Sequence, residues 1–105
     1  MDAKDLAMAI RFKELVTSKI TVNGVMVFGS RARGDSVKES DLDILVTVTH
    51  FNQEIEDYIS DCAWETGFPE DVVIVPIVVE QHAIEDGPLR ESSFIRTVQK
   101  EGIRI

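Results

Sequence analysis

Three apolar runs dominate this sequence and constrain the folds that it can adopt. They lie at residues 23–28, 42–48 and 72–79, and glycine or polar residues bound each of them. Short runs that are rich in valine are typical of buried β-strands. The third run, VVIVPIVV, is apolar throughout, so we expect both of its faces to be covered. Because Pro76 cannot donate a ladder hydrogen bond, we expect this strand to lie at a sheet edge or to bulge there.

Residues 3–19 have the periodicity of an amphipathic helix. The apolar residues expected along its buried side are Leu6, Met8, Ala9, Ile10, Phe12, Leu15 and Val16. The charged residues expected on its wet side are Lys4, Asp5, Arg11, Lys13 and Glu14. The chain therefore begins with an element that needs a sheet or another helix to cover it.

Two further helices complete the expected order. Residues 52–66 return to helical period, with Asn52 as the N-cap and with Gly67 and Pro69 ending the helix. A last helix is expected from about Leu89 to Lys100, and Gly102 would stop it. The order α, β, β, α, β, α predicts one α/β domain of the α+β kind over residues 1–105, with a small mixed sheet and helices packed against it.

Composition excludes several classes of protein. The formal net charge is −8, from 19 acidic and 11 basic residues, which argues against a direct grip on nucleic acid or on an anionic membrane. The single cysteine, Cys62, cannot form an internal disulfide. The charged N-terminal segment lacks the apolar core of a signal peptide or membrane span. We therefore expect a cytoplasmic protein.

The segment between the first two strands carries the candidate chemistry. Gly29 and Ser30 follow the first strand, and Asp41 and Asp43 enter the second. Carboxylates at positions i and i+2 of a strand point to the same face, and their repulsion favours a bridging cation. Mg²⁺ prefers such oxygen ligands. A Gly-Ser turn that opens a helical turn can bring backbone N–H groups close to a phosphate.

Two arginines in the following polar segment could assist this chemistry. Arg31 and Arg33 lie close enough to the Gly-Ser turn to neutralise a nucleotide's phosphates. A phosphate cradle beside paired metal carboxylates is the minimum for phosphoryl or nucleotidyl transfer by a two-metal route. An isolated Asp-x-Asp or Gly-Ser pair is commonly only a surface strand or a turn; the ordered combination favours the functional interpretation.

The stretch GSRARGDSVKESDLDILV resembles the signature of the DNA polymerase β-like nucleotidyltransferase superfamily, and more narrowly of the minimal nucleotidyltransferases encoded beside HEPN-domain partners. The resemblance covers most of the chain and implies the palm-like nucleotidyltransferase fold. It implies that Gly29 and Ser30 bind nucleotide phosphates while Asp41 and Asp43 hold Mg²⁺. The superfamily usually adds a third carboxylate on a later strand, and Asp71 is the nearest candidate here.

The resemblance also implies a reaction. A nucleoside monophosphate, AMP from ATP or its counterpart from another nucleoside triphosphate, would be moved to a hydroxyl of a partner protein. The partner would be a HEPN toxin, and this chain its antitoxin. Self-association of the chain stays open.

Two alternatives remain at this point. Because the third strand has no carboxylate in its body, the chain could be a weak or inactive binding module that neutralises a basic partner. The acidic helix at 52–66, with no lysine or arginine, is either a solvated face or a docking surface for such a partner. A small-molecule modifier, such as an antibiotic nucleotidyltransferase, is disfavoured because 105 residues leave little room for an acceptor pocket.

Overall fold

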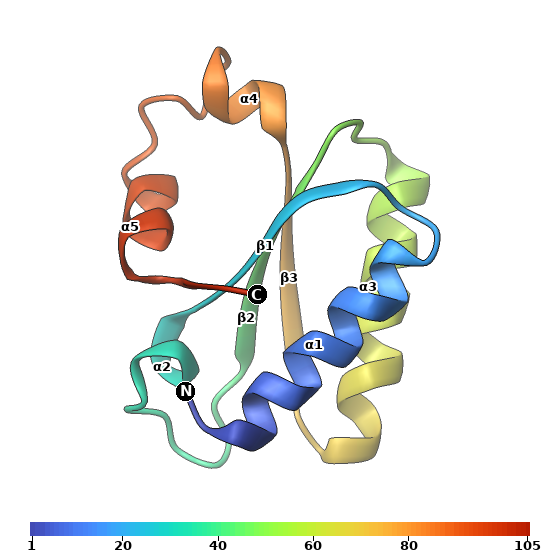
Figure 1. The fold of residues 1–105 in the computed structure, drawn as a ribbon, viewed down its shortest axis with the longest axis vertical. Coiled ribbons are helices and arrows are strands. Elements are labelled where there is room, and N and C mark those ends of the chain that lie inside the picture. Colours follow the sequence, from blue (N-terminus) through green and yellow to red (C-terminus); the bar gives the residue numbers. More distant parts are fainter.

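The chain forms one four-stranded sheet with helices on both of its faces (Figure 1). The computed structural model describes every residue from Met1 to Ile105. The elements in chain order are α1 (Ala3–Thr17), β1 (Val22–Phe28), α2 (Gly29–Arg33), β2 (Leu42–Val48), α3 (Gln53–Gly67), a 3₁₀ turn (Phe68–Glu70), β3 (Ile74–Glu80), α4 (Gln81–Glu85), α5 (Ser93–Glu101) and β4 (Ile103–Arg104). In the order β3-β2-β1-β4, β1 is antiparallel to β2 and β4, and β2 is parallel to β3. The predicted mixed sheet with packed helices is confirmed.

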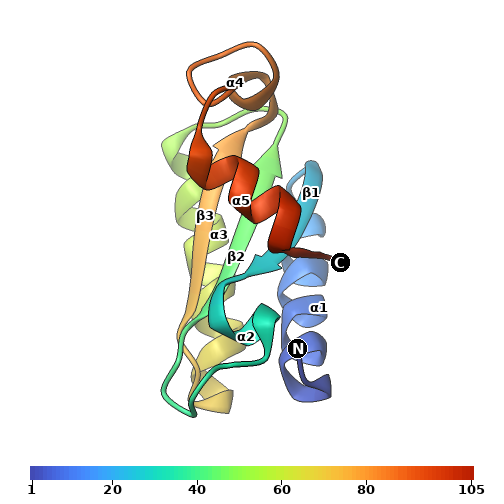
Figure 2. The same ribbon diagram turned by 90° about the vertical axis from the view of Figure 1, so that its left-hand side faces the viewer.

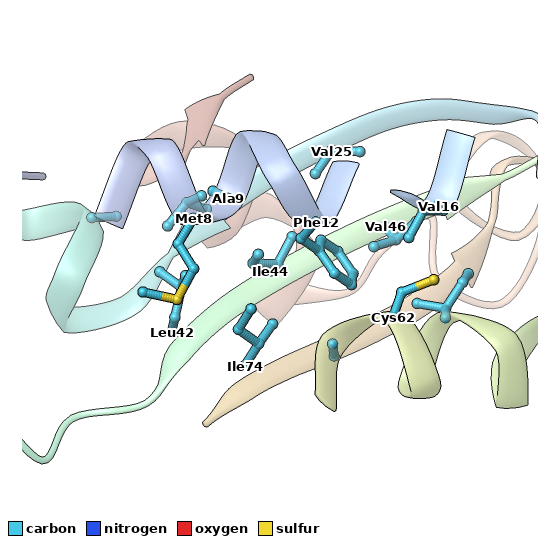
Figure 3. Close-up of a cluster of buried hydrophobic side chains, with 14 of the residues drawn as sticks. Met8, Ala9, Phe12, Val16, Val25, Leu42, Ile44, Val46, Cys62 and Ile74 are labelled. Atoms are coloured by element: carbon cyan, nitrogen blue, oxygen red, sulfur yellow. The ribbon is translucent and has the colours of Figure 1, made fainter. Parts of the chain in front are cut away.

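Two layers of helix sandwich the sheet (Figures 1 and 2). Helices α1 and α3 cover one face, where 15 buried residues form the main core (Figure 3). The β2 residues in that core are Leu42, Ile44, Val46 and Val48. On the other face, Leu45 packs with Ile95 and Val98 of α5 in a smaller cluster. Since alternate strand residues point to opposite faces, Asp43 lies on the α5 side.

Helix α1 turns a different stripe toward the core from the one expected. Met8, Ala9, Phe12 and Val16 are buried as predicted. The exposed apolar residues are Leu6 (38%) and Ile10 (40%). Asp5, expected on the wet side, is only 3% exposed. Its spacing of three and four residues from Met8 and Ala9 puts it within the buried stripe, so the prediction for Asp5 was wrong.

Strand β3 lies at the sheet edge, as Pro76 predicted. The expectation that both of its faces are covered was wrong. Only Ile74 is fully buried, the other strand residues are half-buried, and Val73, just before the strand, is 59% exposed. Helix α3 packs on one face of β3, whereas α5 lies over β1 and β2, so the opposite face of β3 is only partly covered.

The ends of the elements follow local chemistry. The Asn52 side chain caps α3 by accepting from the Ile55 N–H at 2.8 Å, as predicted. Helix α5 begins later than expected because Ser92 caps it, and Gly102 ends it. The sequence interpretation missed α4 and also β4, which pairs Ile103 with Val27. None of the helices combines the length and apolarity needed to pass through a membrane.

Candidate nucleotide and metal site

The turn after β1 lies directly against β2. Phe28, the last residue of β1, pairs with Asp43 in the antiparallel ladder. Gly29 follows with φ +78°, a backbone conformation that residues other than glycine rarely adopt. A Cβ atom at Gly29 would lie 2.5 Å from the Asp43 Oδ2 atom. Glycine is therefore required twice at this position, by the backbone angle and by the carboxylate that lies against it.

Helix α2 is a single short turn that begins at Gly29. Ser30 is half-buried in this turn, and its carbonyl accepts from the N–H groups of Gly34 and Asp35 at 2.9 and 3.1 Å. Gly34 ends the turn with φ +84°. The first residues of α2 thus face the start of β2, which puts the Gly-Ser turn and the Asp-x-Asp pair in one place.

The two carboxylates at the start of β2, Asp41 just before the strand and Asp43 within it, differ in environment. Asp41 is exposed, whereas Asp43 is half-buried beneath the Gly29 turn. Burial raises the pKa of the Asp43 carboxyl above its usual range, and the negative charge of Asp41 raises it further. A bound cation would relieve both effects. This pair of oxygen donors with an unneutralised charge therefore fits a magnesium ion.

The strand beside Asp41 and Asp43 contributes no carboxylate. The Val73 carbonyl accepts from the Leu42 N–H at 2.9 Å, and Val75 is the register partner of Asp43. Asp71 lies outside β3, exposed and with φ 56° at the end of the 3₁₀ turn. No three carboxylate, histidine or cysteine side chains are arranged to hold a metal ion. The structure thus does not gather Asp71 with the β2 pair, because the chain turns before it reaches the strand.

Arg31 differs from the expected phosphate ligand. It is buried, and its Nη1 atom contacts Asp5 Oδ1 at 2.8 Å. Its Nε atom donates to the Ser40 carbonyl at 2.8 Å, and Nη2 donates to the Lys38 carbonyl at 3.1 Å. All three guanidinium nitrogens are therefore committed within the protein. Arg31 ties α1 to the loop that leads into Asp41, and the nucleotide-binding role predicted for it is not supported.

Arg33 remains free to meet a ligand. Its side chain is 51% exposed and makes one surface contact, from Nε to Asp35 Oδ2 at 3.2 Å. With Gly29, it lines a cavity of about 90 Å³ between α2 and α5. The other residues that line this cavity are Phe28, Phe94, Thr97, Val98 and Glu101. Phe94 closes one side by packing edge-on against Phe28, with ring centroids 5.5 Å apart.

Sequence reasoning missed Asp5, Phe94 and the closing role of α5. The signal for Asp5 was present, since it lies in line with the apolar residues of α1. Nothing in the local sequence around Phe94 indicates that the last helix returns to the Gly29 turn. That contact depends on how α5 packs across the sheet.

Comparison with known proteins gives the family. A family model described as a nucleotidyltransferase domain matches residues 9–105. A candidate protein adenylyltransferase of Methanocaldococcus jannaschii is 35% identical over 69 residues, which are 61% of this chain and 67% of that protein. The residues matched by the family model include the Gly29 turn and the strands β1 and β2 around it.

Solved structures share the fold at lower identity. A toxin–antitoxin structure with AMP-PNP superposes with a TM-score of 0.60 at 19% identity, over 91% of this chain and 70% of the other. A candidate nucleotidyltransferase of Sulfolobus solfataricus gives 0.56 at 21% identity, over 99% and 87% of the two chains. The complex of a tri-AMPylated Shewanella oneidensis HEPN toxin with its MNT antitoxin gives 0.53 at 16% identity, over 95% and 70%.

The family model spans nearly the whole chain and includes the Gly29 turn that lies against Asp43. The chain belongs to the nucleotidyltransferase domain family and is a nucleotidyltransferase.

Proposed function

We propose that the chain transfers AMP from ATP to a hydroxyl group of a HEPN-type partner protein and so acts as its antitoxin. The observation that carries this proposal is the contact of the Gly29 turn with Asp43, because a turn suited to bind phosphate and a carboxylate suited to bind a metal ion lie side by side. The M. jannaschii relative, a candidate protein adenylyltransferase, and the neighbouring complex with an AMPylated HEPN toxin support the choice of reaction and partner.

Each group has a role in this proposal. Asp41 and Asp43 would hold Mg²⁺, which neutralises phosphate charge when bound. Backbone N–H groups at Gly29 and Ser30, with Arg33, would bind the phosphates of ATP. The acceptor oxygen attacks the α-phosphorus, a new P–O bond forms, and the bond to the bridging oxygen breaks. Pyrophosphate leaves with that bond's electron pair, and the hydroxyl proton passes to water.

Transfer of label from ATP tests this function. The purified chain would be mixed with Mg²⁺, ATP labelled at the α-phosphate and HEPN proteins, including the product of any adjacent gene. We expect label on the HEPN protein, abolished in Asp41→Asn/Asp43→Asn. The matched control is Asp35→Asn/Glu39→Gln, which removes the same charge from the neighbouring exposed loop. Label that persists in the Asp41→Asn/Asp43→Asn protein would contradict the proposal.

A binding module with weak transfer is the second candidate. The valines at positions 73 and 75 favour it, because they occupy the strand positions nearest to the carboxylate pair. This candidate predicts that Asp41→Asn/Asp43→Asn still neutralises the partner by binding alone. Loss of neutralisation in that variant, with binding retained, would exclude it.

A further inference from the structure

The outer face of α3 carries a stripe that no other part of the chain covers. The inward face of this helix is buried at Ile59, Cys62, Ala63 and Thr66. The stripe opposite consists of Glu54, Asp57, Asp61, Trp64 and Phe68, which follow one another at helical spacings of three and four and are all exposed. We name these five residues the α3 stripe. Figure 1 shows α3 on the right-hand side of the molecule, with α1 beside it and the sheet to its left.

The C-terminal half of the α3 stripe is aromatic. Trp64 is 67% exposed and Phe68 is 66% exposed, and their rings pack with centroids 5.1 Å apart. Beside Trp64 runs a groove of about 280 Å³ between α3 and the edge strand β3, lined in part by Val73 and Pro76. Exposed large apolar side chains beside an apolar groove are typical of an interaction site.

The N-terminal half of the α3 stripe is acidic and unneutralised. No lysine or arginine occurs in α3, and none of the chain's ion pairs involves Glu54, Asp57 or Asp61. The complementary surface is therefore cationic next to an apolar patch. A second copy of this chain is disfavoured, because its own stripe is equally acidic and its net charge is −8. Nucleic acid and anionic membranes are disfavoured for the same reason.

The groove and the carboxylate pair are linked through the edge strand at Val73. This residue is 59% exposed and lines the groove, and its carbonyl accepts from Leu42, which stands between Asp41 and Asp43. Because Asp43 lies on the α5 side of the sheet, a partner seated in the groove would reach the site around the edge strand β3. Docking by an added strand is disfavoured because Pro76 interrupts the donors of the edge strand. Side chains of a folded partner are the better fit.

We infer that the α3 stripe and its groove form the docking surface for the acceptor protein, which presents arginine or lysine beside apolar side chains. The inference rests on the proposed transfer to a partner protein, whose contact surface it names. Trp64 and Phe68 would be the apolar anchors, and Asp57 and Asp61 would pair with the cations of the partner.

Binding of defined peptides tests the chemistry of this surface. Three labelled helical peptides of equal length would carry leucine on one face and arginine, glutamine or glutamate on the other. We expect the arginine peptide to bind most tightly and the glutamate peptide not to bind. Trp64 is the only tryptophan of the chain, so its emission should shift to shorter wavelength as the arginine peptide covers it.

Matched variants test whether the peptide binds to the α3 stripe or is attracted by the negative charge of the whole chain. Trp64→Gln/Phe68→Gln and Asp57→Asn/Asp61→Asn should each weaken binding of the arginine peptide at least about tenfold, as expected for hot-spot residues. The controls are Leu6→Gln/Val37→Gln, which removes exposed apolar groups elsewhere, and Glu85→Gln/Asp86→Asn, which removes the same charge from the last residue of α4 and its C-cap. Both controls should bind as the wild type does. Equal weakening in stripe and control variants, or no binding by the arginine peptide, would overturn the inference.

The transfer assay distinguishes this inference from the proposed function. If the Trp64→Gln/Phe68→Gln protein still labels the HEPN partner at the wild-type rate, the docking inference fails and the function stands. If the wild type binds the arginine peptide through the stripe but labels no protein, the function fails and the docking surface stands.

Discussion

At the scale of single residues, the site depends on one close contact. Gly29 and Gly34 both have left-handed backbone angles, of +78° and +84°. Only Gly29 also faces a neighbour, because a Cβ at Gly34 would meet nothing within 4 Å. Substitutions at these two glycines therefore distinguish the effect of backbone strain, which both share, from the effect of contact with Asp43, which only Gly29 has.

Gly29→Ala should lower both stability and Mg²⁺-dependent binding of ATP. Backbone strain alone costs about 1–2 kcal/mol at either glycine. At Gly29 the new methyl group must also displace Asp43, so ATP binding should fall sharply, whereas Gly34→Ala should keep it. Urea unfolding and calorimetric titration with Mg²⁺ and AMP-PNP would measure the two effects. Equal loss of binding in both variants would contradict the assignment of the Gly29 contact.

Asp43→Asn should stabilise the metal-free protein at neutral pH. The pKa of Asp43 is raised by burial and by Asp41, so the folded state disfavours the charged carboxylate. Between neutral pH and this raised pKa the group is ionised in both states, and its charge opposes folding. The opposition disappears as pH falls through the raised pKa. Unfolding curves of the two proteins should therefore differ at neutral pH and converge at acidic pH; an unchanged difference across this range would contradict the prediction.

The affinity for Mg²⁺ should depend on the protonation of Asp43. Protons compete with the metal for Asp43, so Mg²⁺ affinity should fall on acidification at a higher pH than for an ordinary carboxylate. Asp41→Gln would remove one cause of the raised pKa and move this fall to lower pH, although it also weakens binding. The midpoint of a pH series, measured by calorimetry, is the observable, and an unmoved midpoint would contradict the assigned cause.

At the scale of elements, the Asp5–Arg31 pair joins α1 to the loop before β2. The two side chains are 4% and 9% exposed, and their contact is 2.8 Å. Arg31 also holds the carbonyls of Lys38 and Ser40, so this pair fixes the path of the chain into Asp41. The first helix thus takes part in shaping the site although it contributes no ligand.

Arg31→Met should destabilise the fold by about 3–5 kcal/mol, because Asp5 would remain as a buried and unpaired charge. Arg33→Met is the control. Its ion pair with Asp35 lies at the surface, so its loss should cost at most about 1 kcal/mol. Chemical denaturation measures both variants. A small effect at Arg31 would show that water reaches Asp5.

Much of this architecture was predictable from local pattern. The strand at 42–48, the Asn52 cap and the edge position of Pro76 follow from residue chemistry alone. The positions of Asp71 and Arg31 could not be predicted in this way. Asp71 is placed by the 3₁₀ turn before β3, and Arg31 is held by Asp5, a partner 26 residues away. The extent to which α5 covers β3 depends on tertiary packing, which the apolar run in VVIVPIVV does not encode.

At the scale of the whole molecule, two cores of unequal size lie on opposite faces of the sheet. The α1–α3 side buries 15 residues in one cluster, whereas the α5 side buries three. Helix α5 forms one wall of the cavity at Gly29 and is held by the smaller cluster. This wall of the site is therefore less firmly anchored than the helices on the α1–α3 side.

Amide hydrogen exchange should reveal this difference. The amides of α5 should exchange through local opening, while those of α1 and β2 should exchange only through global unfolding. Ile95→Ala should speed exchange in α5 with less effect on α1, and Phe12→Ala should speed exchange throughout. Equal protection of α5 and β2 would show that the two faces unfold as one unit.

The acidity of α3 has a consequence for the helix itself. Glu54 and Glu56 lie in its first turn, where the positive end of the helix dipole favours them, but Asp61 and Glu65 lie toward its negative end, which no basic residue offsets. The carboxylates in the C-terminal half of the helix therefore interact unfavourably with the helix dipole. A cation that arrives beside Trp64 would remove this opposition, so binding of the acceptor would tighten the C-terminal turns of α3. The helix would then be most ordered when its partner is present.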